Sequence, residues 1–132
     1  MSLAARLACT GFARSLRFYT DVLGFSTMRY EPEHRRAELE RDGILLEIAE
    51  IQGDELGPLE YPFGRGVLLI VWTQDADAVL SGVEAYGARL HRPMAEAWRD
   101  EDGAHIGHKA FEVADPDGYV LRFCQALPPT LQ

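Results

Sequence analysis

Two short stretches decide the fold: "DGILLEI" (Asp42–Ile48) and "DGYVLRF" (Asp117–Phe123). Each begins with Asp-Gly, a strong signal for a tight turn between two strands. Each then continues as an apolar run with a single charged residue inside it, Glu47 in the first and Arg122 in the second. The same pattern at two places in one chain indicates an internal duplication.

The segments before each stretch follow one order, strand, helix and three strands. Apolar residues recur at helical spacing in residues 12–23 and 76–86, and Gly24 and Gly87 follow as helix ends. The remaining patterns predict strands over residues 7–10, 25–30, 36–41, 44–49, 67–72, 88–91, 108–114 and 119–125, and a polar loop over residues 92–106.

The sequence therefore predicts an α+β fold of two tandem βαβββ modules in a single domain, residues 1–132. The modules cover about residues 4–50 and 66–126, and a linker of residues 51–65, rich in Gly, Pro and acids, joins them. We expect them to form a curled mixed sheet around a central cleft.

Composition narrows the class of partner. A formal net charge of −8 argues against a nucleic-acid partner, and no apolar run is long enough to cross a membrane. No signal peptide is evident at the N-terminus. Cys9 and Cys124 are too few and too far apart for a disulfide framework or a zinc motif, which favours a cytoplasmic protein.

Strand alternation predicts which side chains face the helices. Leu46 and Ile48 form the larger apolar set of one strand, and Leu121 and Phe123 that of the other. Glu47 and Arg122 then occupy equivalent positions on the face away from the helices. Because a charge removed from water needs a partner, three interpretations stay open: an ion pair between these two residues, separate solvated positions, or contact with a polar ligand.

Two further motifs carry a resemblance to a known family. "ARSLRFYTDVLGF" (Ala13–Phe25) resembles the first helix signature of the vicinal oxygen chelate superfamily, and "EVADPDGYVLRF" (Glu112–Phe123) resembles its final hairpin. That superfamily includes glyoxalase I, extradiol dioxygenases, and fosfomycin- and bleomycin-resistance proteins. The resemblance implies paired βαβββ modules, usually in a dimer with ligand clefts.

The metal enzymes of this superfamily hold their metal on the first and last strands of each module. Matched to this chain, those positions fall on Ala4, Glu47, Val67 and Arg122. Glu47 alone offers a donor, since a guanidinium stays protonated and repels a cation. A catalytic metal needs about three protein ligands, so we expect neither a metal nor another cofactor.

The function predicted first is metal-independent small-molecule binding of the bleomycin-resistance type in a cytoplasmic homodimer. Sequestration of an antibiotic is one form of this function. The residues expected to line the ligand cleft are Leu45, Glu47, Val67, Leu69, Trp98, Val120, Arg122 and Cys124. Arg122 would anchor a ligand anion or pair with Glu47.

Two alternatives remain. The first is a divergent glyoxalase- or dioxygenase-type enzyme, a lyase or isomerase, that acts on a small oxygenated substrate with Glu47 as base or ligand. The second is an interaction module without a ligand.

Trp72 alternates onto the same side of its strand as Leu68 and Ile70, so we expect it to pack beneath a helix. The carboxylates of Asp115-Pro116-Asp117-Gly118 fit a type I turn and lack the spacing of a calcium loop.

Overall fold

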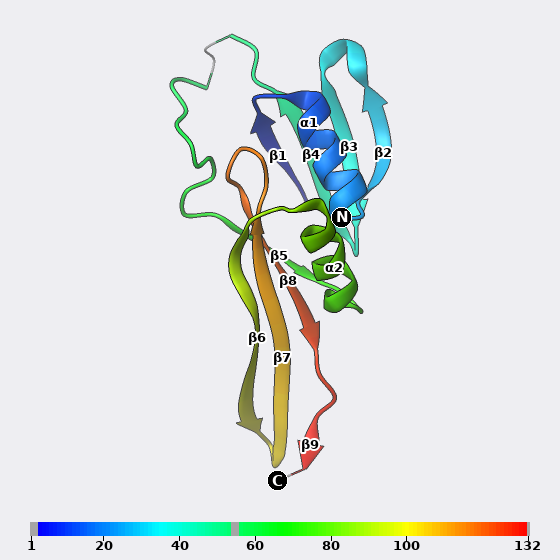
Figure 1. Cartoon of the computed structure of the whole chain (residues 1–132), viewed down its shortest axis with the longest axis vertical. Coiled ribbons are helices and arrows are strands. Elements are labelled where there is room, and N and C mark those ends of the chain that lie inside the picture. The colour runs from blue at the N-terminus through cyan, green and yellow to red at the C-terminus, as the bar shows by residue number, and fades with distance from the viewer. Residues whose placement is uncertain (1–2, 54–55, 132) are drawn as a thin grey trace. The chain divides into compact units, whose positions relative to one another are not determined.

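The protein divides into two compact units, seen in a computed structural model that describes residues 3–53 and 56–131 (Figure 1). The N-terminal unit comprises the chain up to Val67 together with Asp115–Tyr119. The C-terminal unit comprises Leu68–Ala114 and the chain from Val120 onward. Each unit combines helix with a mixed sheet, which confirms the predicted α+β class of two modules.

In the N-terminal unit the sheet order is β1-β4-β3-β2, with β1 parallel to β4 and the other pairs antiparallel. Its elements are β1 (Ala4–Cys9), α1 (Phe12–Arg17) with a π-helical turn at Phe18–Val22, β2 (Ser26–Glu31), a 3-10 turn at Pro32–His34, β3 (Arg36–Arg41) and β4 (Ile44–Glu50). Asp42 and Gly43 both have positive φ, 49° and 83°, which confirms the tight turn between β3 and β4.

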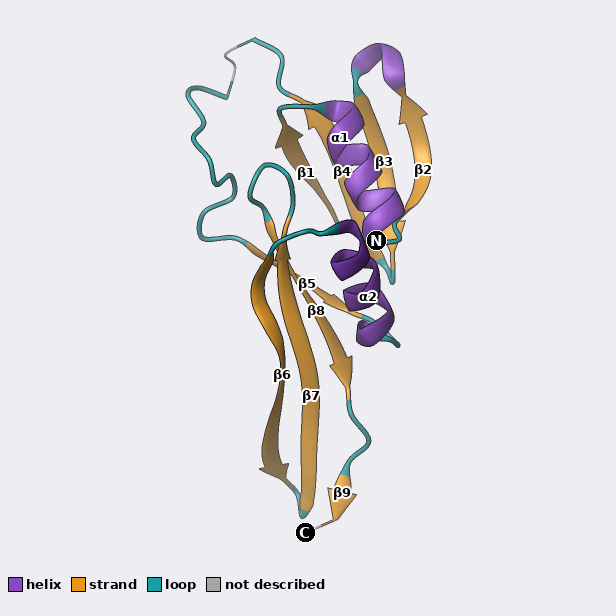
Figure 2. Cartoon of the chain, viewed as in Figure 1, coloured by secondary structure: helices purple, strands orange, loops and turns teal. Residues whose placement is uncertain are grey.

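The C-terminal unit repeats this order, with strands β5-β8-β7-β6 and β5 parallel to β8 (Figure 2). Its elements are β5 (Leu68–Trp72), α2 (Ala76–Tyr86), β6 (Leu90–Glu101), β7 (Ala104–Ala114), β8 (Val120–Ala126) and β9 (Thr130–Leu131), which pairs with β7. The Asp75 carboxylate caps α2 by accepting a hydrogen bond from the Ala78 N–H at 3.0 Å. The described strands form two separate sheets, one in each unit.

The predicted polar loop over residues 92–106 is wrong. Those residues belong to a long hairpin in which β6 and β7 run side by side and turn at Asp102-Gly103, both with positive φ (Figure 1). Most of β6 is exposed, so the hairpin lacks the alternation of apolar and polar residues that predicts a half-buried strand. Asp102-Gly103 is itself a hairpin signal.

Each core lies between a helix and one face of its sheet. In the N-terminal unit Leu39, Leu46 and Ile48 are buried on the helix side, with Tyr19 and Leu23 from the helical segment. In the C-terminal unit the buried residues of the sheet are Val71, Phe111, Val113, Leu121 and Phe123, covered by Val79 and Val83 of α2. The apolar sets assigned to the helix side of β4 and β8 are confirmed.

The turn Asp115–Tyr119 is part of the N-terminal unit, and its carboxylates are structural. The Asp115 carboxylate accepts hydrogen bonds from the Tyr19 hydroxyl at 2.7 Å and from the N–H groups of Asp117 and Tyr119 at 2.9 and 3.0 Å. Burial nevertheless raises the pKa of Asp115 to about 6. Asp117 accepts from the N–H and hydroxyl of Thr10 at 3.1 and 2.6 Å. The Gly118 N–H donates to the Asp115 carbonyl at 3.0 Å, as a type I turn requires.

Candidate functional site

The candidate site lies on the face of a sheet that carries no helix, here called the open face. Residues paired across a sheet point to the same side. In the N-terminal unit this rule places Leu45 and Glu47 on the open face, and in the C-terminal unit it places Val120, Arg122 and Cys124 there. The side predicted for these five residues agrees with the strand register.

The side predicted for β5 is wrong. Leu69 pairs with Leu121, which is fully buried on the helix side, so Leu69 faces α2 and not the open face. Val67 precedes β5 and belongs to the N-terminal unit. Trp72 pairs with Cys124 and is 55% exposed, so it does not lie beneath a helix. A run of five apolar residues, Leu68–Trp72, contains no alternation from which its inner face could be predicted.

Glu47 is neutralised within its own unit. Arg6 stands opposite it on β1 and donates a hydrogen bond from Nε to the Glu47 carboxylate. Next to this pair, Glu31 binds Arg29 and Arg36 at 2.8 Å each, and the hydrogen bond from Arg36 lowers the pKa of Glu31. Glu38 lies on the same face, opposite Glu47. The open face of the N-terminal unit therefore carries three arginines and three carboxylates close together.

Arg122 is held by a carboxylate on its own sheet. Glu112 stands opposite it on β7 and accepts from Nε at 2.8 Å, and Nη2 lies 2.7 Å from the same oxygen. The Glu112 side chain is only 5% exposed. Glu112 was not among the predicted site residues, although the hairpin turn at Asp115–Gly118 fixes the register that pairs it with Arg122.

A break in the register of β6 adds two more basic side chains. Between Leu90 and Arg92 the pairing shifts, so that His91 and Arg92 both lie near Glu112. His91 Nε2 lies 3.8 Å from the second Glu112 oxygen, Oε1, and Arg92 Nε lies 3.6 Å from it. One buried carboxylate thus has two arginines and a histidine around it, which leaves a local surplus of positive charge. This group of four residues is called the Glu112 cluster below.

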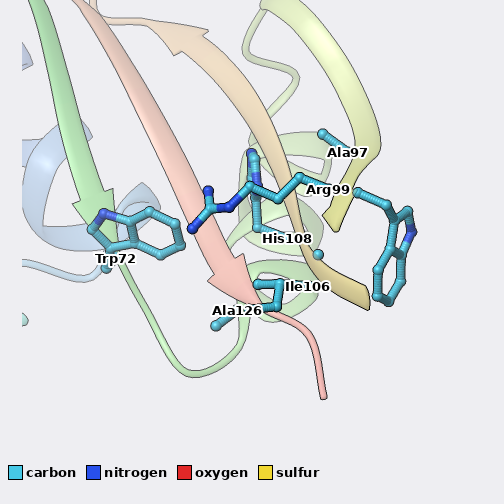
Figure 3. Close-up of a pocket in the computed structure, with 8 residues that line it drawn as sticks. Trp72, Ala97, Arg99, Ile106, His108 and Ala126 are labelled. Atoms are coloured by element: carbon cyan, nitrogen blue, oxygen red, sulfur yellow. The ribbon is translucent and has the colours of Figure 1, made fainter. Parts of the chain in front are cut away.

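A hollow of about 170 Å³ opens farther along the same sheet (Figure 3). The ring of Trp72 meets that of His108 edge-on, with ring centroids 5.9 Å apart. Figure 3 shows the Arg99 side chain extending toward Trp72. The lining residues are Trp72, Ala97, Trp98, Arg99, Ile106, Gly107, His108 and Ala126. Of these residues, only Trp98 was a predicted site residue.

Trp98 lies on β6, not in a loop, and its ring is committed to the hairpin. It stacks on His105 with centroids 4.9 Å apart and planes 5° from parallel, and it covers Gly107. The indole N–H donates to Glu96 at 3.0 Å. Trp98 borders the hollow, but the register places its ring on the side of Gly107, opposite the side of His108.

Cys124 joins the two parts of this face, since it pairs with Trp72 on β5 and follows Arg122 by two residues. Its thiol is buried, and burial raises its pKa. Burial likewise raises the pKa of Cys9 to about 11. Both thiols therefore stay protonated at neutral pH, as expected of small apolar side chains in a core.

The side chains at the superfamily's metal positions do not fit a divalent cation. The register places Arg6, not Ala4, beside Glu47, and Ile70, not Val67, beside Arg122. Two guanidinium groups and an isoleucine offer no donor atom to a cation. Among the described residues, Glu31, Glu33 and His34 do bring possible donor atoms within 4.8 Å of one another, but Glu31 is already bound to two arginines.

Comparison with known proteins places the chain in a family. The model of the glyoxalase/bleomycin resistance protein/dioxygenase superfamily matches residues 3–123. The chain belongs to this superfamily. No curated protein matches its sequence. No helix among the described residues is long and apolar enough to span a membrane.

Several solved structures are similar to this chain over nearly its whole length. TioX from Micromonospora sp. ML1 is 22% identical with a TM-score of 0.70, covering 96% of this chain and 99% of TioX. A glyoxalase/bleomycin resistance protein/dioxygenase from Alicyclobacillus acidocaldarius is 16% identical with a TM-score of 0.67, covering 97% and 92%. The integron cassette protein VCH_CASS1 from V. Cholerae is 18% identical with a TM-score of 0.65, covering 95% and 94%. At these identities the likeness shows the fold, and membership in the superfamily is consistent with small-molecule binding.

Proposed function

We propose that this protein binds a small molecule without a metal, on the open face of the C-terminal sheet. The observation that carries this proposal is the exposed apolar side of β5, where Leu68, Ile70 and Trp72 are 36%, 45% and 55% exposed. A contiguous apolar surface beside a few convergent polar groups is the usual composition of a ligand site. The hollow at Trp72 and the Glu112 cluster provide these two components on one sheet.

Metal-independent binding of the bleomycin-resistance type is the form of this function that the donor chemistry supports. Sequestration of an antibiotic is one use of such a site. The enzyme alternative needs Glu47 as a free base or ligand, whereas its carboxylate is bonded to Arg6. A base in that position would have to break the ion pair before it could take a proton from a substrate.

The test is native mass spectrometry of the purified protein, before and after mild denaturation and refolding. A stoichiometric adduct lost on unfolding, and weakened when Trp72 is replaced by leucine, is the expected result. Arg65→Gln in the linker serves as the matched control, because Arg65 bonds only the Tyr61 carbonyl among the contacts described. Titration with Ni²⁺, Zn²⁺ and Fe²⁺ after chelation checks metal independence, and stoichiometric micromolar binding that requires Glu47 would refute it.

We further infer a cytoplasmic homodimer without a nucleic-acid or membrane partner. The support for the dimer is β6, which is exposed over most of its length and forms an edge of its sheet. An edge strand of this length invites pairing with a further chain. Light scattering after size exclusion should give twice the mass of 14.8 kDa, and a monomer at micromolar concentration would overturn this inference.

A further inference from the structure

The open face of the C-terminal sheet holds two different features at a fixed spacing. At one position is the Glu112 cluster, where two arginines and a histidine surround a single carboxylate. At the other is the hollow beside Trp72 and His108. We propose that the ligand is an organic anion with a planar ring, whose anionic group binds the Glu112 cluster and whose ring lies in the hollow. This inference rests on the proposed function and names its ligand class.

The charge of the cluster favours an anion. Arg122 and Arg92 together carry two positive charges against the single negative charge of Glu112. A guanidinium has five N–H donors, and Glu112 engages two nitrogens of Arg122, so donors remain for a carboxylate. The Arg92 side chain is 72% exposed and can turn toward a ligand. The buried Glu112 fixes Arg122 in place, which lowers the entropy lost when an anion binds.

The hollow suits a ring. Its volume of about 170 Å³ is close to that of a cavity, roughly 150 Å³, that is known to admit benzene. Trp72 presents an aromatic surface, and Ile106, Ala97 and Ala126 add apolar walls. Aromatic rings prefer stacked or edge-on contacts with other rings, so a planar group gains more here than a puckered one.

The spacing follows from the register. Ile70 pairs with Arg122 and Trp72 pairs with Cys124, so the Trp72 position is two residues along the sheet from the arginine. A strand rises about 3.3 Å per residue, so Trp72 lies about 7 Å along the sheet from Arg122. His108 and Ala126 lie four residues from Glu112 and Arg122, which places the far part of the hollow about 13 Å away. A ring acid with a short chain spans the shorter distance when its ring packs against Trp72.

The open face of the N-terminal unit provides the contrast. There Arg6 binds Glu47, and Arg29 and Arg36 both bind Glu31. Glu38 lies on the same face opposite Glu47, so three carboxylates balance the three arginines and no surplus of positive charge results. An organic anion is therefore expected to discriminate between the two faces.

The experiment uses three probes on the full chain, measured by isothermal titration calorimetry. The probes are 2-naphthylacetate, its neutral analogue 2-(2-naphthyl)ethanol and its cationic analogue 2-(2-naphthyl)ethylamine. We expect the acid to bind at least about tenfold tighter than the alcohol, since a hydrogen bond to a charged group contributes a factor of this order. Cyclohexylacetate, which keeps the charge and loses the planar ring, should bind about fivefold more weakly than the naphthyl acid.

Variants locate the binding. Arg92→Gln should weaken binding of the acid about fivefold or more and leave the alcohol unchanged, and because Arg92 is largely exposed this variant keeps the fold. Trp72→Leu should weaken both the acid and the alcohol. The matched control is Arg6→Gln on the N-terminal open face, which should change neither.

The outcomes separate this inference from the proposed function. If the alcohol or the amine binds as tightly as the acid, the anion class is overturned, while binding at Trp72 still supports the site. If Arg6→Gln weakens binding as much as Arg92→Gln, the assignment to the Glu112 cluster is overturned. If no probe binds, the inference fails, and the search for adducts by native mass spectrometry decides the proposed function independently.

Discussion

The two units repeat one βαβββ order, yet their open faces differ in kind. In the N-terminal unit that face is charged, and Glu47 and Glu31 bind three arginines beside a further carboxylate, Glu38. In the C-terminal unit it is apolar along β5, with one buried carboxylate beneath a surplus of basic groups. The helix sides are alike, both closed by branched apolar and aromatic residues. The fold therefore requires apolar residues on the helix side of each sheet, whereas the residues of the open face can differ between the units.

The last hairpins of the two units show the same contrast. Asp42-Gly43 is an exposed tight turn, whereas Asp115–Tyr119 is largely buried and is tied to Thr10 and Tyr19 of the N-terminal unit. A Cβ added at Gly43 would meet nothing within 4 Å. At Gly118 it would lie 2.5 Å from Cβ and 2.7 Å from Cα of Pro62. The two turns thus carry the same dipeptide under different packing.

Replacing each glycine by alanine should separate the energetic cost of backbone conformation from that of packing. This pair of variants is expected to give the largest loss of stability. Both positions have positive φ, 83° at Gly43 and 96° at Gly118, so each variant bears a strain of about 1 kcal/mol. Gly118→Ala adds a clash with the Pro62 backbone and should lose about 3 kcal/mol or more of unfolding free energy. Urea denaturation measures both. Equal losses of unfolding free energy would show that the positive φ accounts for the whole effect and that Pro62 moves aside at no cost.

Asp115 should make the stability of the protein depend on pH. Its pKa is raised by burial to about 6 from an ordinary value of 3.8, so the folded state holds this proton more tightly than the unfolded chain. The stabilisation is complete below about pH 4 and is lost as pH rises through 6, a change of up to about 3 kcal/mol. Asp115→Asn keeps the acceptor for both N–H groups and cannot ionise.

The measurement is the unfolding free energy of the wild type and of Asp115→Asn from pH 4 to pH 7. The variant should lack the part of the decline that belongs to Asp115, and should exceed the wild type in stability at pH 7. Tyr19→Phe is the control, because it removes one hydrogen bond from the carboxylate and keeps the charge. Identical slopes in the wild type and Asp115→Asn would contradict a raised pKa.

The fold could be predicted from the sequence where apolar and polar residues alternate, because the two faces of an element then differ. Asp42-Gly43 and the alternation around Glu47 and Arg122 predicted the hairpins and the faces of β4 and β8 correctly. The helix over residues 76–86 followed from its apolar spacing and from the Asp75 cap. The long hairpin was missed because a strand exposed on both faces has no apolar period, although Asp102-Gly103 marked its turn.

The candidate site followed only in part. Arg122 stood out because a charge inside an apolar strand needs a partner, but the expected partners were Glu47 or a ligand. The structure supplies Glu112, which the hairpin register could have identified. Trp72 was wrongly predicted on the helix side because β5 is apolar at every position. Only its pairing with β8 shows which side chains face the helix. The central cleft between modules stays a prediction.

Glu112 and Glu47 offer the next test, on carboxylates that each hold an arginine. Glu112→Gln leaves three basic groups around a buried neutral amide and should cost about 2 kcal/mol of unfolding free energy. Glu47→Gln breaks a pair whose arginine is 59% exposed and should cost less than about 1 kcal/mol. Urea denaturation at pH 7 distinguishes them. A larger loss for Glu47 would mean that the N-terminal open face is buried in the assembled protein.

Replacing Trp98 should have the smallest effect on stability. It tests the hairpin of β6 and β7, which is longer than any hairpin described in the N-terminal unit. Trp98→Ala removes the stack on His105 and the cover over Gly107, contacts that lie within the hairpin and outside the core. A region with few buried apolar contacts opens locally, so amide exchange should accelerate over residues 96–107 while the global unfolding free energy falls by about 1 kcal/mol or less. Hydrogen exchange with mass spectrometry resolves the two. A global loss well above this value would mean that the hairpin is packed against something larger than itself, as the homodimer inferred above would provide.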